Sequence, residues 1–198
     1  RHTYRDINKR AKQLAQALQS AGIGMTDRVA TLAWNDHRHL EAYYGVSGMG
    51  AVVHTINPRL FPEQLIYIIN HAEDRILLTD PMFLPLIEKI IDNCPKLEKI
   101  VAMCTAENLP ESSLDIIAYE DFIGGFDGNY TWPEFEETAA SSLCYTSGTT
   151  GNPKGALYTH RSTVLHALMA GTPSVTGTGS NATLMPVVPM FHVNAWGQ

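Results

Sequence analysis

A dense group of hydroxyl, glycine and lysine residues occupies Tyr145 to Gly155, which reads YTSGTTGNPKG. Its glycines let the backbone approach a ligand closely and expose N–H groups, and its Ser and Thr side chains add hydroxyl donors. Lys154 places a compact positive charge beside the turn that Asn152 and Pro153 set. Donors crowded around one cation suit an anion rich in oxygen atoms. The segment therefore predicts a polyphosphate-binding loop.

Two well-known phosphate-binding patterns do not fit this segment. A Walker loop needs Gly-Lys followed by Ser or Thr, whereas Lys154 follows a proline and precedes Gly155. A dinucleotide fingerprint is also excluded, because no Gly-x-Gly-x-x-Gly opens a helix here. The next residues, GALYTH, alternate as a strand does, so the expected context is strand, loop, strand. On composition alone, a plain Gly/Ser/Thr linker stays open.

The order of residues in YTSGTTGNPKG closely resembles the phosphate-binding signature of the adenylate-forming superfamily. That superfamily includes acyl-CoA synthetases, firefly-type luciferases and the adenylation domains of peptide synthetases. Near the end of the chain, PMFHVNAWG looks like a second active-site motif of the same enzymes. This motif and INPRLFPEQL are most similar to fatty acyl-CoA synthetases, so the chain resembles an AMP-forming acyl-CoA synthetase over nearly its whole length.

The resemblance implies a reaction and a role for particular residues. ATP would activate a carboxylic acid, most simply a fatty acid, as acyl-AMP, and the thiol of coenzyme A would then take the acyl group. The β- and γ-phosphates of ATP would be held by Thr146, Ser147, Gly148, Thr149, Thr150 and Gly151. Lys154 would assist their departure, and Thr149 would help to hold Mg²⁺. His192 would border the carboxylate and the adenylate, with Val193 beside it, and Trp196 would line or gate the acyl tunnel.

Helical and strand patterns alternate on both sides of the loop, most regularly ahead of it. Thr3 and Asp6 match a capping-box variant before an amphipathic helix, which Gly22 and Gly24 end. Further strands are expected at RVATLAW, AVVHTI, RILLTD, KIVAMC, SSLCYTS and TLMPVV, and further helices near HLEAYYGVSGMG, PEQLIYIINHAE and FLPLIEKIIDN. Short, wholly apolar strands between helices predict a doubly wound α/β fold with mostly parallel sheets covered by helices. His192 should then lie at the end of the strand TLMPVV, where such sheets place ligands.

The chain divides in two at the return of the strand pattern. Residues 1 to about 140 predict a first α/β subdomain, with a surface excursion from Thr105 to Ala140 that holds one short helix near YEDFIGG. Residues 141–198 predict the phosphate-loop part of a second subdomain. The resemblance implies further segments and a small C-terminal domain beyond Gln198, so we expect the 198-residue chain alone not to turn over.

Composition excludes several other classes of protein. The net charge of −6, with scattered Lys and Arg, offers no basic stripe for nucleic acid. No apolar run approaches the roughly 20 residues that a membrane-spanning helix needs. Cys94, Cys104 and Cys144 are odd in number and far apart, which favours a reducing compartment, the cytoplasm. A homodimer is compatible with the sequence.

Other interpretations stay open beside the ligase. A module that grips ATP or polyphosphate without chemistry would share the loop, and an enzyme that adenylates an aryl acid or an amino acid would share the mechanism. The histidines outside the second motif have no such context, and we interpret them as structural or exposed: His37, His39, His54, His71 and His166.

Overall fold

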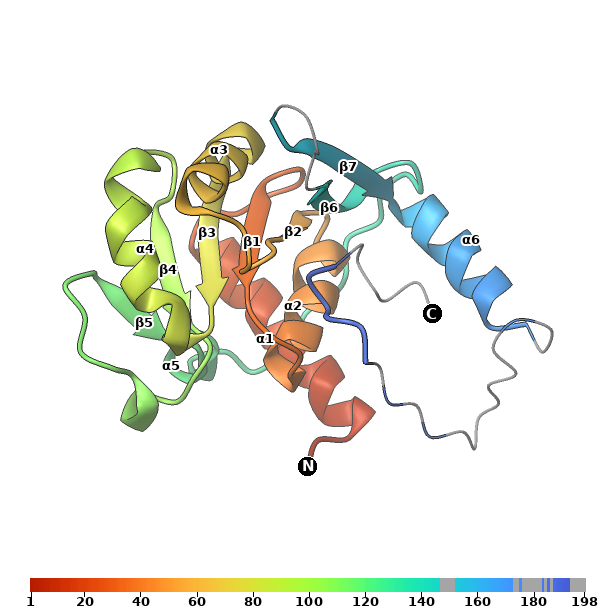
Figure 1. Cartoon of the computed structure of the whole chain (residues 1–198). Helices are drawn as coiled ribbons and strands as arrows, with labels where there is room; N and C mark the ends of the chain where they lie inside the picture. Colours follow the sequence, from red (N-terminus) through yellow and green to blue (C-terminus); the bar gives the residue numbers. More distant parts are fainter. Residues whose placement is uncertain (147–151, 173–174, 176–182, 184, 186, 193–198) are drawn as a thin grey trace.

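The computed structural model describes residues 1–146, 152–172, 175, 183, 185 and 187–192 (Figure 1). Within them the helices are α1 (Tyr4–Ser20), α2 (His37–Gly48), α3 (Pro62–Ala72), α4 (Leu84–Ile90), α5 (Tyr119–Gly124) and α6 (His160–Ala170). The strands are β1 (Arg28–Leu32), β2 (Val52–Thr55), β3 (Asp74–Thr79), β4 (Lys99–Ala102), β5 (Ile116–Ala118), β6 (Ala140–Thr146) and β7 (Lys154–Thr159). Short 3₁₀ turns occupy Pro81–Phe83, Ile91–Asn93 and Ala106–Asn108.

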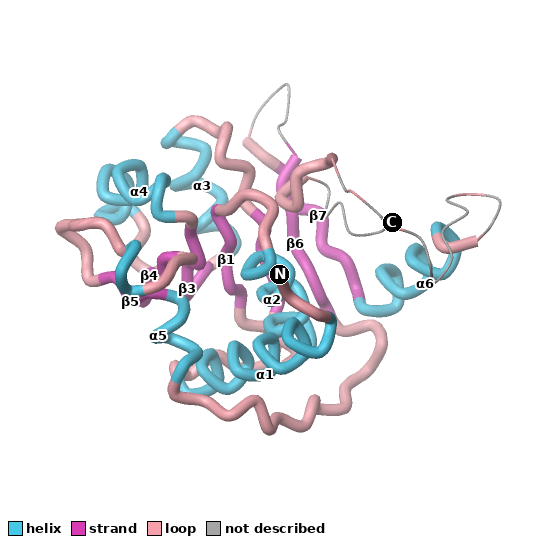
Figure 2. Tube along the Cα trace, turned by 90° about the horizontal axis from the view of Figure 1, so that it is seen from below, coloured by secondary structure: helices cyan, strands magenta, loops and turns pink. Residues whose placement is uncertain are grey.

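The strands form a seven-stranded sheet in the order β5-β4-β3-β1-β2-β6-β7. Every neighbouring pair is parallel except β6 and β7, which are antiparallel. Helices α1, α2 and α5 share one hydrophobic core cluster, and α3 and α4 share another, so the sheet is covered on both faces (Figure 2). This confirms the doubly wound, mostly parallel α/β fold.

Local sequence signals account for where several helices begin. The Thr3 hydroxyl accepts from the Asp6 N–H at 3.2 Å while the Asp6 carboxylate accepts from the Thr3 N–H at 2.7 Å, which completes the capping box of α1. Asp36 caps α2 by accepting from the His39 N–H at 2.8 Å. Pro62 is the first residue of α3, where its missing N–H costs nothing.

Two sequence expectations differ from the structure. The excursion after Thr105 contains β5, a three-residue edge strand that is too short to show a period in the sequence. The segment TLMPVV was expected to be a strand, but Thr183, Met185 and Val187 are described and lie outside any strand. A strand needs a neighbouring backbone to pair with, and Met185 and Val187 are largely exposed. The division into subdomains near residue 140 stays a prediction, and β6 and β7 continue the sheet that β1 to β5 form.

Candidate functional site

The glycine-rich segment connects the antiparallel strands β6 and β7, as the strand, loop, strand prediction requires. Thr146 pairs with Lys154 in the ladder, and the Thr146 hydroxyl lies 3.4 Å from the Lys154 carbonyl oxygen. Both residues are exposed. The strand β7 begins at Lys154, one residue earlier than expected, so the lysine backbone is held by strand pairing rather than lying on a free turn. Five predicted phosphate-binding residues lie outside the described residues: Ser147, Gly148, Thr149, Thr150 and Gly151.

The glycine-rich segment starts at the edge of the sheet that is formed by the carboxyl ends of the parallel strands. Because β6 runs parallel to β2, the end of β6 at Thr146 lies beside the residues that follow Thr55. Strand β1, next to β2, ends at the same edge, and so do β3 and β4. Parallel α/β sheets bind their ligands at this edge.

The second motif is anchored at the same edge. The Asn35 side chain, just after β1, donates to the Val188 carbonyl at 3.1 Å and accepts from the Met190 N–H at 2.6 Å. The Tyr43 hydroxyl donates to the Met190 carbonyl at 2.5 Å. Phe191 is buried, with its ring 5.5 Å from that of Trp34.

His192 follows this anchored segment and is exposed. Its N–H donates to the Pro189 carbonyl at 3.0 Å, which closes a turn. The preceding residue, Phe191, has its carbonyl 3.5 Å from the Thr55 hydroxyl, and Thr55 pairs with Cys144 of β6. The structure thus brings Thr146, Lys154 and His192 to one edge of the sheet. Val193 and Trp196 lie outside the described residues.

A polar and aromatic cluster supports β6 just before the loop. The Tyr145 hydroxyl is 2.7 Å from His71 Nδ1 on α3, and its ring centroid is 5.1 Å from that of His54 on β2. Burial, with a contribution from the charge of Asp74, raises the pKa of Tyr145 to about 12. His54 Nδ1 lies 2.7 Å from the carboxylate of Asp74, and both side chains are buried. From the sequence alone, these histidines are interpreted as structural or exposed, and Tyr145 has no assigned role.

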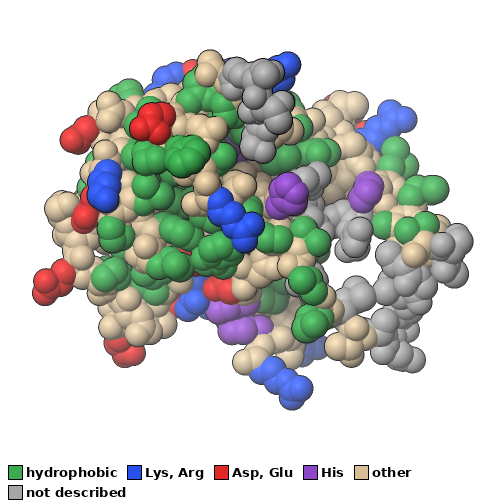
Figure 3. All heavy atoms as spheres, viewed as in Figure 1, with side chains coloured by type: hydrophobic (Ala, Val, Ile, Leu, Met, Phe, Trp, Pro, Cys, Tyr) green, Lys and Arg blue, Asp and Glu red, His purple; other side chains and the backbone are tan. Residues whose placement is uncertain are grey.

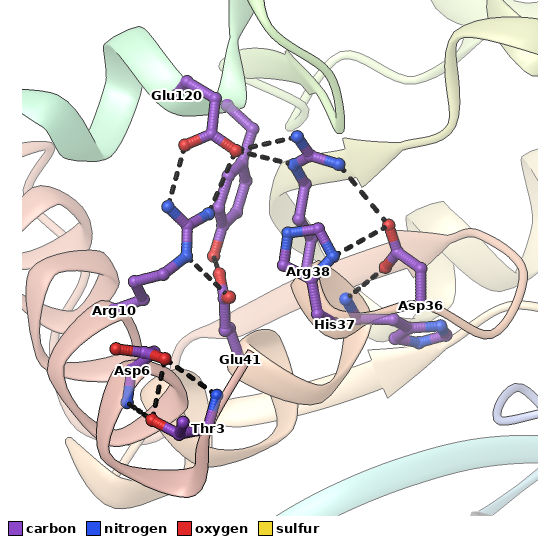
Figure 4. A network of polar contacts seen from close by, with 10 residues as sticks. Thr3, Asp6, Arg10, Asp36, His37, Arg38, Glu41 and Glu120 are labelled. Atoms are coloured by element: carbon purple, nitrogen blue, oxygen red, sulfur yellow. Dashed lines mark hydrogen bonds and ion pairs between the residues drawn. The ribbon is translucent and has the colours of Figure 1, made fainter. Parts of the chain in front are cut away.

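A network of charged side chains fixes the helices behind the turn between β1 and α2 (Figure 4). The Arg10 guanidinium on α1 contacts the fully buried Glu41 carboxylate on α2 at 2.7 Å and contacts Glu120 on α5 at 2.8 and 3.0 Å. Arg38 bridges the Glu120 carboxylate at 2.8 Å and Asp36 at 3.6 Å. These contacts join α1 and α2 to α5, which lies far from them in the sequence.

His39 holds the same turn from inside the molecule. Its Nδ1 is 3.0 Å from the Trp34 carbonyl and its Nε2 is 3.0 Å from the Thr31 hydroxyl. A carbonyl only accepts, so Nδ1 carries the proton of the neutral ring and Nε2 accepts from Thr31. Burial lowers the pKa of His39 to about 4.

We expect this histidine to make the protein sensitive to acid. The folded-state pKa lies below the ordinary 6.5, so its stabilising contribution is complete above about pH 6.5 and is lost as the pH falls toward 4. Between pH 7.5 and pH 5 the free energy of unfolding should fall by about 2 kcal/mol through His39 alone. Urea unfolding of the wild type and of His39→Gln at both pH values measures the difference. An equal pH dependence of the free energy of unfolding in both proteins would show that His39 is not the cause of the acid sensitivity.

The described residues limit how a metal could bind. They contain no group of three or more His, Cys, Asp or Glu side chains that could hold a metal ion. The ligands that this edge offers to a metal are hydroxyls, such as that of Thr146, and hydroxyl and phosphate oxygens are ligands that Mg²⁺ accepts.

In the described parts of the chain, no helix combines the length and the hydropathy needed to cross a bilayer.

A cleft of about 1060 Å³ lies between α1 and α2 on one side and β7 and α6 on the other. Its lining includes Tyr4, Tyr44, Trp132, Tyr158 and His166. Beside it, hydrophobic side chains gather over α6, at the right of the space-filling view (Figure 3). Those on α6 that are more than half exposed are Val164, Leu165, Leu168 and Met169. Much of the apolar surface of α6 is therefore not covered by the described residues.

The family described as "AMP-binding enzyme" matches residues 1–198. A medium-chain fatty acid–CoA ligase of Ectopseudomonas oleovorans is 54% identical over 198 residues, which are 100% of this chain and 36% of the ligase. A 3-methylmercaptopropionyl-CoA ligase of Ruegeria pomeroyi is 54% identical over 192 residues, 96% of this chain and 36% of that protein.

A solved structure agrees with the fold. An anthranilate CoA ligase in complex with anthranoyl-AMP superposes with a TM-score of 0.81 at 30% identity, covering 88% of this chain and 33% of the ligase. The chain spans about 36% of the length of the curated relatives it matches.

Proposed function

Because the chain belongs to the AMP-binding enzyme family, we propose that it is part of a longer acyl-CoA ligase that activates a carboxylic acid with ATP. The observation that carries this proposal is that described residues of both motifs lie at one edge of the sheet. The ends of the glycine-rich segment, Thr146 and Lys154, and the anchored residue His192 all lie where the parallel strands end. A site at this edge can hold a polyphosphate beside a second reactant.

The roles of the residues follow their places in the motifs. Thr146 and residues 147–151 cradle the β- and γ-phosphates with hydroxyls and backbone N–H groups. Lys154 adds positive charge as pyrophosphate departs, and Thr149 helps to hold Mg²⁺, which neutralises phosphate charge. His192 and Val193 border the carboxylate, and Trp196 lines the acyl tunnel.

The chemistry needs these groups because a carboxylate is a poor electrophile. It is anionic and has no good leaving group. One oxygen of the carboxylate attacks the α-phosphorus of ATP. The bond between the α-phosphorus and the oxygen that bridges it to the β-phosphate breaks, and pyrophosphate leaves. The thiol of coenzyme A then attacks the acyl carbon of acyl-AMP and releases AMP. Two anions meet in the first step, so alignment and charge neutralisation are the main tasks of the residues at this edge.

A fatty acid or a related simple acyl acid is the substrate we propose. One relative at 54% identity is named for medium-chain fatty acids, and another at 54% is named for 3-methylmercaptopropionate. Both names denote acids without an amino group, which supports a simple acyl acid over an amino acid. Both relatives have the same sequence identity to this chain, so identity does not indicate which of the two acids is the better guide to the substrate.

We also propose that the chain lies within a larger N-terminal adenylation domain, with residues 141–198 opening its second subdomain. The apolar surface of α6 and the adjacent cleft support this, because monomeric proteins rarely expose so continuous an apolar face. Further parts of the longer protein would bury this face. On this proposal, the 198 residues alone do not form acyl-AMP.

Trp196→Ala should change which acids the enzyme prefers. A residue that lines or gates the acyl tunnel limits the volume available to the chain, so its removal should shift kcat/KM toward longer or bulkier acids by about tenfold. Steady-state rates with acids of increasing length measure this shift. An unchanged length preference would remove Trp196 from the tunnel.

ATP–pyrophosphate exchange tests the proposal in the full-length protein. Short, medium and long fatty acids, aryl acids and amino acids would be supplied one at a time. We expect exchange that depends on a fatty or other simple acyl acid. ATP binding without any acid-dependent exchange would instead support the alternative function, a nucleotide-binding module without chemistry.

A further inference from the structure

We propose that Asn35 is a positioning residue that sets the place of His192 in the site, a proposal that rests on the proposed function. Asn35 is the third residue after β1, and the segment it binds lies more than 150 positions further along the chain. Neither motif from the sequence includes Asn35. Its role follows from the contacts that it makes.

The Asn35 side chain bonds to the segment at two points. Its Nδ2 donates to the Val188 carbonyl at 3.1 Å, and its Oδ1 accepts from the Met190 N–H at 2.6 Å. A side-chain amide carries a donor and an acceptor, so it can pair with a backbone as another strand would. Two opposed bonds fix both the distance and the rotation of the backbone from Val188 to Met190. His192 follows two residues later, and its N–H is bonded to the Pro189 carbonyl within the same turn.

The residues on either side hold Asn35 rigidly. The Trp34 N–H donates to the Asp80 carboxylate at 2.8 Å, and the Trp34 carbonyl accepts from His39. Asp36 caps α2 and contacts Arg38, which the Glu120 network holds (Figure 4). The Asn35 backbone therefore lies between two fixed neighbours. Its side chain can therefore fix the position of the backbone from Val188 to Met190, which leads to His192.

Other contacts to the segment do not replace this pairing. The Tyr43 hydroxyl donates to the Met190 carbonyl, and Phe191 packs against Trp34. These hold the segment against the sheet, but neither satisfies the Met190 N–H or the Val188 carbonyl. Without the Asn35 amide, the segment should stay near the edge of the sheet, but the orientation of His192 should be less fixed. Small misplacements of a reacting group can cost about 100-fold in rate.

The test uses Asn35→Ala and Asn35→Asp in the full-length protein. Aspartate keeps the shape and the acceptor but loses the donor, and its charge faces the Val188 carbonyl. We expect both variants to lower the kcat of ATP–pyrophosphate exchange by about 10- to 100-fold. The KM for ATP should change less than about twofold, because the glycine-rich loop binds the phosphates. Asn108→Ala is the matched control, since Asn108 is an exposed asparagine whose amide bonds locally to Thr105 at 2.9 Å.

A double-mutant cycle with His192→Ala separates positioning from general damage. If Asn35 acts through His192, then Asn35→Ala should cost less than about threefold in the His192→Ala background. A full, multiplicative loss in that background would overturn the proposal. So would a rise in the KM for ATP at constant kcat, or an equal loss in Asn108→Ala. Acid-dependent exchange by the wild type is measured first, so failure of the proposed function is recognised separately.

Discussion

Replacing Thr149 with alanine should lower the kcat/KM of ATP–pyrophosphate exchange by about 100- to 1,000-fold, while Lys154→Ala should lower it by about tenfold or less. On the proposed function, the hydroxyl of Thr149, which lies in the TSGTTG run, would contact a departing phosphate oxygen and a bound Mg²⁺. Removing one hydrogen-bond donor of this kind from an active site typically lowers the rate by about 100- to 1,000-fold. Thr149 thus carries the largest expected effect on activity.

Lys154 is expected to matter less because of its surroundings. Its backbone is paired with Thr146 at the start of β7, but its side chain is exposed to solvent. The attraction of an exposed charge for phosphate is weakened by water and by dissolved salt. On the proposed function, the charge of Lys154 would therefore add to a site that hydroxyls and backbone N–H groups define.

Thr149→Ser is the matched control for this prediction. Serine keeps the hydroxyl and loses only a methyl group, so it should retain most of the exchange rate. The effect of Lys154→Ala should also shrink as the ionic strength rises, whereas that of Thr149→Ala should not. Equal losses in the two alanine variants, or a larger loss for Lys154→Ala, would contradict the ordering.

Arg10→Met should destabilise the protein by about 3 to 5 kcal/mol in the free energy of unfolding. Its guanidinium is shared by Glu41, whose side chain is fully buried, and by Glu120. Burial already raises the pKa of Glu41, and the bond from Arg10 opposes that rise. Without Arg10, the only hydrogen-bond partner left to the Glu41 carboxylate among the described residues is the Tyr119 hydroxyl, which donates to it at 2.9 Å. Urea unfolding measures the loss.

Two further variants test whether the burial of charge is the cause. Arg10→Met combined with Glu41→Met removes both charges, so the double variant should be more stable than Arg10→Met alone. Arg161 forms an exposed pair with Glu137 at 3.5 Å, and Arg161→Met should leave the free energy of unfolding nearly unchanged. If the double variant were less stable than Arg10→Met, a buried unpaired carboxylate would not be the cause.

The fold was largely predictable because its signals are local. The capping box at Thr3, the proline at the start of α3 and the short apolar strands each indicate an element without reference to the rest of the chain. The short β5 was missed because three residues are too few to show a period. The strand expected at TLMPVV was wrong, because strand formation depends on a pairing partner that the sequence pattern does not reveal.

The site was predictable only in part. The motifs identified Thr146, Lys154 and His192, and the structure brings these three to one edge. Asn35 and Tyr43 were missed because their partners are backbone groups of residues 188–190, and backbone contacts leave no residue pattern in a single sequence. One signal was available for Asn35. It follows a strand of the parallel sheet closely, and residues in that position face the ligand edge.

The most direct test of the account follows an oxygen atom. The full-length protein would be given a fatty acid labelled with ¹⁸O in its carboxylate, together with ATP, Mg²⁺ and coenzyme A, and the released AMP would be examined by mass spectrometry. If the carboxylate attacks the α-phosphorus, cleavage of acyl-AMP by the thiol leaves one ¹⁸O atom in AMP. Label in pyrophosphate or phosphate, or thioester formation with unlabelled AMP, would contradict activation through an acyl-adenylate.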